Sequence, residues 1–309
     1  MKRILVTGSN GLLGQKLTET ILADTELELI ASGRGEDRFP VQQNYRYVTL
    51  DVSDSRQVDD VLGKYMPDAV IHTAAMTNVD QCEDNKDECW IANVDAVKNL
   101  IAACEKYRIH LIHLSTDFIF DGEAGPYSED AEPHPLSYYG LTKLEAEKLI
   151  QSSNCSWTIL RTIIVYGIVR DLSRSNIVLW AKDALEKGKV INVVNDQWRM
   201  PTLAEDLAAC CILAAKKKAT GIYNASGKDM MSILEIVEQV ADYWKLDRSL
   251  INPVSSFSLS QTARRPKRTG FILDKTMNVL GYTPHSFAEG LQILDKQFNE
   301  LIKQSKSEG

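Results

Sequence analysis

The chain has 309 residues, of which 44% are hydrophobic and 25% charged, and its formal net charge at pH 7 is −7. This composition excludes collagen-like, disordered and small disulfide-stapled proteins, and the length predicts about two structural units. The acidic balance disfavours nonspecific binding to nucleic acid or to an anionic membrane. No apolar stretch reaches the roughly eighteen residues that a spanning helix needs. We therefore expect a cytoplasmic globular protein with neither nucleic acid nor membrane as a partner.

The cysteines and histidines do not predict a metal site. Six cysteines show no Cys-x-x-Cys spacing and no zinc-like pattern with the five histidines. In a chain of this kind we expect them to be reduced, partly buried thiols. Two of the histidines, His72 and His113, fall inside apolar runs and read as strand residues.

Strand-like and helix-like segments alternate along the first half of the chain. Such alternation, with nearly continuous apolar strands, predicts an α/β fold whose doubly wound parallel sheet is covered by helices on both faces. The strands are expected at residues 3–7, 27–31, 47–50, 69–73, 109–115 and, closing the series, 157–162; the helices are expected at residues 11–24, 54–65, 87–107 and 141–151.

The second half is less regular. It contains helix-like segments at 177–187, 203–218 and 232–244, with extended pieces at 190–194 and 221–225 between them. No internal repeat or low-complexity linker is present, so the two halves are expected to share an interface. The polar tail at 303–309 is expected to be frayed.

A glycine-rich turn follows the first predicted strand. It reads Thr7-Gly8-Ser9-Asn10-Gly11-Leu12-Leu13-Gly14, with a strand before it and a helix after it. That context is typical of a Rossmann-type dinucleotide site, in which the three glycines allow a tight turn, close approach of a pyrophosphate and close packing of helix on sheet. The helix N-terminus would supply free N–H groups to the phosphates. A glycine turn without any ligand is the plainer alternative.

The end of the second strand indicates which dinucleotide is bound. A fold selective for NAD places Asp or Glu there, whereas this chain has Ser32 and Arg34, and no carboxylate before Glu36. An uncharged Ser32 beside Arg34 suits a 2′-phosphate, so we expect NADPH; NADH stays possible through Glu36, and Arg34 could simply be a solvated charge. Further cofactor contacts are expected from Asp51, Val52, Ala74, Ala75 and Met76.

A Tyr-x-x-x-Lys pair opens the helix predicted near residue 141. Tyr139 and Lys143 would lie on one helix face, and the strand that precedes them ends in Ser115-Thr116-Asp117. A lysine ammonium can stabilise a phenolate and hold the nicotinamide ribose, while Thr116 could steady a developing alkoxide. Tyr139 would then donate a proton during ketone reduction. The plainer alternatives are a buried hydroxyl at Thr116 and a packing role for Tyr139 against Pro135.

These residues resemble the extended short-chain dehydrogenase/reductase superfamily, and within it the dTDP-4-dehydrorhamnose reductases. The resemblance extends over nearly the whole chain. It is carried by the glycine turn, by Ala74–Asp80, Ser115–Gly122, Gly125–Glu129, Pro135-Leu136, Tyr139, Lys143, Leu160–Thr162, Val165–Gly167, Asp196-Gln197 and Pro201-Thr202.

The resemblance implies a catalytic triad of Thr116, Tyr139 and Lys143, with Tyr139 and Lys143 also contacting the cofactor. It further implies reduction of a nucleotide-linked 4-keto-6-deoxysugar at C4, as in dTDP-rhamnose biosynthesis. Residues 1–162 would form the cofactor-binding domain, completed by parts of 203–245, and 163–309 would mainly bind the substrate. A homodimer stays open. Contacts to the substrate are expected from Thr77, Asn78, Asp117, Asn176, Arg199 and Arg265.

Four departures from the family pattern fall in the substrate-facing half. Ser137 stands where the family usually has Asn, Ile163-Ile164 replace Ser-Trp, and Arg199 replaces Gly. The late motif reads Arg265-Pro266-Lys267-Arg268-Thr269. The redox chemistry is therefore better supported than a particular sugar product.

The basic run at residues 264–268 allows three interpretations. A nucleic-acid-binding or nuclear-localisation patch is disfavoured by the negative net charge of the chain. A solvated loop is the plain interpretation, and the third is an anion clamp in which Arg265 pairs with a diphosphate, as the family motif implies.

Two other functions stay open beside the reductase. One is a nucleotide-sugar epimerase or dehydratase that recycles a tightly held NAD. The other is a non-catalytic, NADP-binding regulatory subunit similar to the β subunit of methionine adenosyltransferase. Fold alone does not decide among them.

Overall fold

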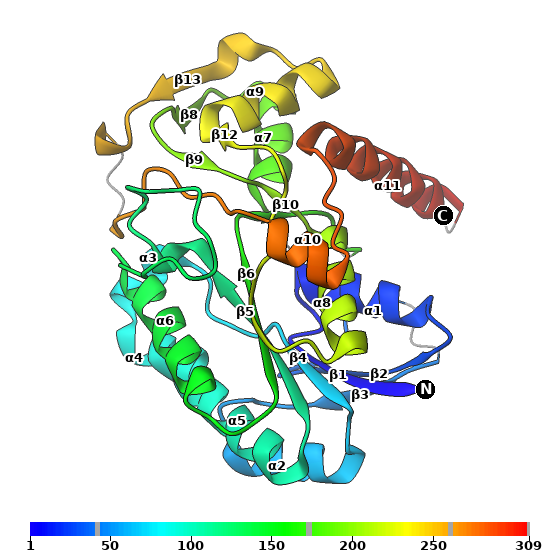
Figure 1. Cartoon of the computed structure of the whole chain (residues 1–309). Coiled ribbons are helices and arrows are strands. Elements are labelled where there is room, and N and C mark those ends of the chain that lie inside the picture. Colours follow the sequence, from blue (N-terminus) through cyan, green and yellow to red (C-terminus); the bar gives the residue numbers. More distant parts are fainter. Residues whose placement is uncertain (41–43, 171–174, 259–261, 308–309) are drawn as a thin grey trace.

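The computed structural model describes residues 1–40, 44–170, 175–258 and 262–307. Its centre is a seven-stranded sheet in the order β11-β6-β5-β4-β1-β2-β3 (Figure 1). Every neighbouring pair in this sheet is parallel, which confirms the predicted doubly wound α/β fold. The strands are β1 (Lys2–Thr7), β2 (Leu27–Gly33), β3 (Arg46–Thr49), β4 (Ala69–His72), β5 (His110–Thr116), β6 (Trp157–Thr162) and β11 (Gly221–Asn224).

Helices cover both faces of this sheet. On one face α1 (Leu12–Leu22) and α8 (Ala204–Lys217) pack on alternate strand residues such as Ile4 and Ile71. On the other face lie α2 (Ser55–Tyr65), α5 (Ala96–Tyr107) and α6 (Tyr138–Gln151), against residues such as Leu5. Both faces of the strands are therefore buried, which explains why they read as continuous apolar runs.

The sheet takes one strand more than the sequence analysis expected. The sequence predicts a strand series that ends at residues 157–162, with parts of 203–245 completing the cofactor-binding domain. Strand β11, which lies within 203–245, pairs in parallel with β6, Gly221 opposite Thr158. Helix α8, which precedes β11, packs against α1. The extended piece at 221–225 was recognised, but a four-residue strand carries no signal for the sheet it joins.

A smaller group of elements lies at one end of the sheet, at the top of Figure 1. There β8 (Ile191–Val194) pairs in parallel with β13 (Ile251–Val254), and α7 (Ile177–Glu186) and α9 (Ile233–Trp244) share a separate apolar core. Two-residue strands connect this group to the rest: β7 (Val165–Tyr166) with β10 (Thr202–Leu203), and β9 (Trp198–Arg199) with β12 (Met231–Ser232).

The C-terminal part is more helical than predicted. Helices α10 (Asp274–Leu280) and α11 (Phe287–Ser307) were not expected, and α11 runs through most of the tail that was expected to fray. Its apolar residues, among them Phe287, Leu291 and Leu294, join the core of α7 and α9. Single 3₁₀-helical turns lie at Asp117–Ile119, Arg248–Leu250 and Ser256–Ser258. Over the described ranges, no helix combines the length and apolarity needed to cross a bilayer.

Candidate active site

The glycine turn lies between β1 and α1 and needs glycine for steric reasons. Gly8 has φ +71°, and a Cβ there would lie 2.8 Å from the backbone N of Ala74. A Cβ on Gly14 would overlap the carbonyl oxygen of Gly8. The first glycine therefore permits the left-handed turn against β4, and the third lets the helix approach the turn.

Helix α1 begins without a side-chain cap. Gly11 is the N-cap residue and carries no side chain that could accept from the first-turn N–H groups. The amides of Leu12 and Leu13 at this helix start therefore lack the usual partners, and the positive end of the helix dipole is open. A backbone cradle that a Cβ would fill, next to uncapped amides, fits the pyrophosphate of a dinucleotide.

The side chains of the turn brace the loop that follows β2. Both the N–H and the hydroxyl of Ser9 donate to the carbonyl of Ser32, at 3.0 and 3.1 Å. Asn10 donates to the carbonyl of Glu36 at 2.9 Å and accepts from the N–H of Arg38 at 2.9 Å. Arg34 is exposed in this loop. The turn thus determines where Arg34 and Glu36 are presented.

Ser32 is placed differently from the expectation that its hydroxyl suits a ribose phosphate. Its side chain is fully buried, and the hydroxyl donates to the carbonyl of Val6 at 3.1 Å. The reason is that β2 lies between β1 and β3, so its side chains face packed helices rather than solvent. Only the main chain of Ser32 contacts the glycine turn, through Ser9.

The other expected cofactor residues follow β3 and β4, at the same edge of the sheet. Asp51 is half-buried and accepts from the N–H and hydroxyl of Ser53 at 3.0 and 2.7 Å, and Val52 is buried. Ala74 and Met76 are half-buried and Ala75 is exposed. In parallel sheets ligands bind where the carboxyl ends of the strands meet, which is the edge that these residues share with Gly8.

Asn93 was missed by the sequence analysis. The helix expected at 87–107 is divided into α4 (Lys86–Trp90), a π-helical turn (Ile91–Asp95) and α5, and buried Asn93 lies in that turn. Its amide holds both main-chain groups of Met76, at 2.8 and 3.0 Å, and donates to the hydroxyl of Thr142 at 3.1 Å. π-Helical turns often mark functional sites. A buried-face Asn inside a helical pattern was the available signal.

Tyr139 is a buried, neutral phenol. Its ring is 8% exposed and packs edge-on against Phe118, with centroids 5.7 Å apart. Burial raises the pKa of the Tyr139 phenol, and the neighbouring Thr116 hydroxyl only partly opposes this. Thr116 is 6% exposed and donates to Asp117 Oδ1 at 3.2 Å. The structure therefore brings Tyr139 and Thr116 together, with the phenol able to donate a proton.

Lys143 faces the strand rather than the phenol. Its Nζ donates to the carbonyl of Leu114 at 2.6 Å and lies 3.1 Å from Nε2 of His113. The side chain is 3% exposed, and burial lowers the pKa of Lys143 to about 8. The expected lowering of the Tyr139 pKa by this ammonium is not seen here, because burial dominates at Tyr139 and the ammonium is engaged with β5.

Helix α6 starts three residues earlier than the predicted residue 141. Ser137 is its N-cap, and the Ser137 hydroxyl accepts from the N–H of Gly140 at 3.2 Å. A Cβ on Gly140 would overlap the carbonyl oxygen of Phe118, so this glycine allows the helix to approach the turn after Thr116. Ser137, a departure from the family pattern, therefore has a capping role that positions Tyr139.

Arg199, expected at the substrate, is instead buried within the protein. It is 3% exposed, and its guanidinium donates to the carbonyls of Pro266 and Trp198, at 2.8 and 2.7 Å, and of Lys267 at 3.3 Å. Its Nε lies 3.6 Å from Asp117 Oδ2. The N–H groups of Arg199 are thus directed at main-chain carbonyls and at a buried carboxylate. In this structure Arg199 therefore supports the 262–268 segment and does not face a ligand.

Asp117 belongs to the same buried network. It is 2% exposed, and burial raises the pKa of its carboxyl, which the charge of Arg199 opposes. The hydroxyl of Thr269 also donates to Asp117. Asp117, which directly follows β5, thus contacts Thr269 and, through Arg199, the 262–268 segment.

The remaining expected substrate residues lie on three segments. Asn176 caps α7, and its amide donates to the carbonyl of Gly167 at 2.7 Å. Asn78 caps α3 (Val79–Asp84), and Thr77 is exposed beside it. Arg265 binds the carboxylate of Asp80 through two nitrogens, at 2.6 and 3.2 Å. Asn176 and Asn78 therefore have structural roles, while Arg265 holds a carboxylate in the manner expected for a diphosphate.

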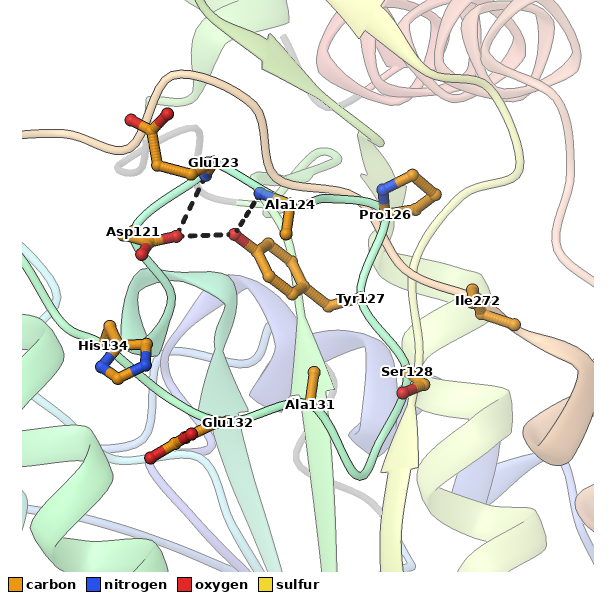
Figure 2. A pocket seen from close by; sticks show the side chains of 10 residues that line it. All are labelled: Asp121, Glu123, Ala124, Pro126, Tyr127, Ser128, Ala131, Glu132, His134 and Ile272. Carbon is orange, nitrogen blue, oxygen red and sulfur yellow. Dashed lines mark hydrogen bonds between the residues drawn. The ribbon is translucent and has the colours of Figure 1, made fainter.

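A surface hollow of about 420 Å³ lies beside the loop between the turn at Asp117–Ile119 and α6, and Figure 2 shows its lining. Tyr127 organises it, because its hydroxyl donates to Asp121 at 2.9 Å and accepts from the N–H groups of Gly122 and Ala124. None of the expected site residues line this hollow. Among the residues that the structure describes, no His, Cys, Asp and Glu cluster could hold a metal ion.

Comparison with known proteins shows the family. Residues 1–299 match the family model described as RmlD substrate binding domain. The methionine adenosyltransferase 2 subunit beta of Xenopus laevis is 30% identical over 268 residues, which cover 85% of this chain and 78% of that protein. The dTDP-4-dehydrorhamnose reductase of Aggregatibacter actinomycetemcomitans is 28% identical over 304 residues, covering 94% and 98% of the two chains.

A solved structure agrees with this match. The dTDP-4-dehydrorhamnose reductase from Bacillus anthracis, in complex with NADP, superposes with a TM-score of 0.83 at 26% identity. The alignment covers 96% of this chain and 100% of that one. The resemblance stated from the motifs is thereby confirmed.

Proposed function

Because the chain belongs to the RmlD substrate binding domain family, we propose that it reduces the keto group of a nucleotide-linked 4-keto-6-deoxysugar at C4, with NADPH as the reductant. The observation that carries this proposal is the pairing of Thr116 with a buried, protonated Tyr139 at the edge of the sheet that also holds the glycine turn. A ketone reductase needs a proton donor at the carbonyl oxygen, and the protonated Tyr139 phenol carries such a proton. Because burial raises the Tyr139 pKa and so weakens this acid, the transfer depends on the positive charge of Lys143 to stabilise the phenolate.

Each residue of the triad has a separate task in this proposal. Thr116 holds the substrate oxygen, and Tyr139 gives it a proton as the alkoxide develops. Lys143 keeps a positive charge near the phenol after that proton has left, which limits the free energy of a buried phenolate. Bound NADPH supplies the hydride that this chain's own residues cannot.

The same reasoning extends to the domains and the cofactor. Residues 1–162, with parts of 203–245, are proposed to bind the cofactor, and 163–309 mainly the sugar nucleotide. Arg34 would contact the 2′-phosphate of NADPH, and its exposure in the loop braced by Asn10 supports this. NADH would rely on Glu36 instead.

A second candidate is an NADP-binding subunit that regulates another enzyme. The 30% identity to the methionine adenosyltransferase subunit of Xenopus laevis favours it, as does the engagement of Arg199 and Arg265 with groups of this chain. The presence of Thr116, Tyr139 and Lys143 favours the reductase.

The decisive experiment follows NADPH absorbance with a panel of nucleotide-linked 4-ketosugars. Reductase function predicts turnover with at least one of them, with one NADPH consumed per alcohol formed. NADP binding by calorimetry without turnover on the whole panel would favour the regulatory subunit. A co-purified NAD with sugar conversion but no net NADPH loss would instead indicate an epimerase or dehydratase.

A further inference from the structure

Three polar side chains lie next to one another across the sheet, at the carboxyl ends of β1 and β4 and in the middle of β5. Thr7 pairs in register with His72, and His72 with His113. One layer further into the sheet, on the same face, the corresponding positions are apolar, with Leu5, Val70 and Leu111 in the core. The three polar residues are at most 2% exposed. Apolar side chains therefore fit this face of the three strands, because they occupy the equivalent positions two residues earlier in each strand.

These side chains connect the glycine turn with Lys143. The hydroxyl of Thr7, which precedes Gly8, lies 2.7 Å from Nδ1 of His72. The His72 and His113 rings stack, with centroids 5.5 Å apart and planes 26° apart. Nε2 of His113 lies 3.1 Å from Nζ of Lys143. Two polar contacts, joined by the stacked rings of His72 and His113, therefore link the start of the cofactor turn to Lys143.

The contact between His113 and Lys143 specifies a tautomer. A lysine ammonium can only donate, so Nε2 of His113 must present its lone pair, and the ring proton then resides on Nδ1. Nδ1 is buried and has no hydrogen-bond partner within the described part of the chain. Burial and the charge of Lys143 lower the pKa of His113, which agrees with a neutral ring.

A buried N–H without a partner is destabilising, so the imidazole has no packing advantage over an apolar side chain at this position. Its one strong polar contact is with Lys143. We infer that His113 is a positioning residue for Lys143: together with the Leu114 carbonyl, its Nε2 holds the ammonium against the middle of β5. The expected effect of His113 on catalysis rests on the proposed function, whereas its contact with Lys143 does not.

The other charged and titratable groups around Lys143 are few. On α6, Tyr139 lies one turn before Lys143 and Glu147 one turn after it. Cys89 comes from α4, and His72 lies behind His113 on β4. His113, by contrast, has its Nε2 within hydrogen-bond distance of Nζ, at 3.1 Å. Removing it takes away one of the two acceptors that the ammonium uses.

The kinetic test compares His113→Leu with His113→Gln, whose amide oxygen can replace the acceptor. His110→Leu is the matched control, because His110 is equally buried on the same strand and contacts Ser156 and Thr158 instead. We expect His113→Leu to lower kcat at least about tenfold, with KM within about twofold. The basic limb of the kcat–pH profile of His113→Leu should move to lower pH, because the Lys143 ammonium loses its proton more easily when it has fewer acceptors.

In that comparison, His113→Gln should recover most of kcat and of the profile, and His110→Leu should shift neither limb. An unchanged kcat and pH profile in folded His113→Leu would overturn the inference, as would an equal shift in His110→Leu.

A spectroscopic test is independent of turnover. In protein labelled with ¹⁵N-histidine, assigned by loss of the signal in His113→Gln, we expect His113 to be protonated on Nδ1 between about pH 6 and 8. Its Nε2 shift should change in Lys143→Met. An Nε2–H tautomer, or no response to Lys143→Met, would contradict the inference even if the enzyme is active. If no ketosugar is reduced, the proposed function fails, but this measurement still decides whether His113 positions Lys143. The same holds if His113→Leu does not fold, because the measurement does not use that variant.

Discussion

Asp80 and Arg265, separated by 185 positions in the sequence, form a two-point ion pair that joins α3 to the 262–268 segment. Asp80 Oδ1 also accepts from the N–H of Ala263 at 2.9 Å. The hydrogen bonds from Arg265 hold the pKa of Asp80 below its ordinary value. The guanidinium face proposed for a diphosphate is therefore occupied by a carboxylate of the same chain, and the two must compete.

Replacing Asp80 by Asn should reveal this competition. Asp80→Asn keeps the shape of the side chain but removes its charge, so we expect dTDP to bind roughly three- to tenfold more tightly. Calorimetric titration with dTDP measures this. Arg265→Gln should abolish most of the binding, and Asp59→Asn, which removes an exposed pair with Lys106, should leave it unchanged. Weaker binding to Asp80→Asn would show that the pair holds the segment in its binding-competent form.

Tyr139→Phe should separate chemistry from cofactor binding. The change removes the proton donor while the ring keeps its packing on Phe118. We expect turnover to fall at least about a hundredfold, with NADPH affinity within a few fold. Absorbance at saturating ketosugar and fluorescence titration with NADPH give the two quantities. Full turnover in the variant would refute the assignment of Tyr139 as the acid.

Arg34→Ala should weaken NADPH much more than NADH. Its exposed guanidinium lies in the loop after β2, where an additional phosphate would be neutralised. An effect of about tenfold or more on the Kd ratio is expected. Arg46→Ala is the control, since Arg46 is exposed at the opposite end of the neighbouring strand. Equal losses for the two cofactors would reject a contact with the 2′-phosphate.

Gly14→Ala should destabilise the protein and impair dinucleotide binding. The added methyl group would overlap the Gly8 carbonyl, which must then shift, at about 1–3 kcal/mol of unfolding free energy. Gly35→Ala adds the same group where no atom lies within 4 Å, so its effect should stay within about 0.5 kcal/mol. Denaturant unfolding of both variants measures the difference. Similar stability for Gly14→Ala and wild type would contradict the close approach of α1.

Stability should fall as the pH drops below about 6.5. Burial lowers the pKa of His110 to about 4, so between these values the unfolded chain binds more protons than the folded one. The free energy of unfolding then decreases with falling pH, by at most about 1.4 kcal/mol per pH unit for this histidine. Urea unfolding at several pH values tests this. His110→Leu should show a shallower dependence; an identical slope would exclude His110 as a contributor.

Local patterns were sufficient to predict the parallel sheet and the glycine turn that follows its first strand. Continuous apolar strands, the glycine turn after the first of them and the four-residue spacing of Tyr139 and Lys143 are properties of short segments. Their backbone consequences follow from sterics and periodicity, which act within a few residues. The place of β11 beside β6 and the division of one long helix around Asn93 were not predictable in this way.

The sequence by itself determined the parallel α/β fold and the glycine cradle at Gly8–Gly14, and it led to the proposal of Thr116, Tyr139 and Lys143 as a triad. Only the tertiary structure decided how the polar groups are used: Ser32 and Arg199 bind main chain, Arg265 binds Asp80, and Lys143 binds β5 through His113 and Leu114. The physical reason is that a side chain's partners are chosen by segments far apart in the sequence. Residue type states what a group can donate or accept, whereas packing alone states which partner comes within reach.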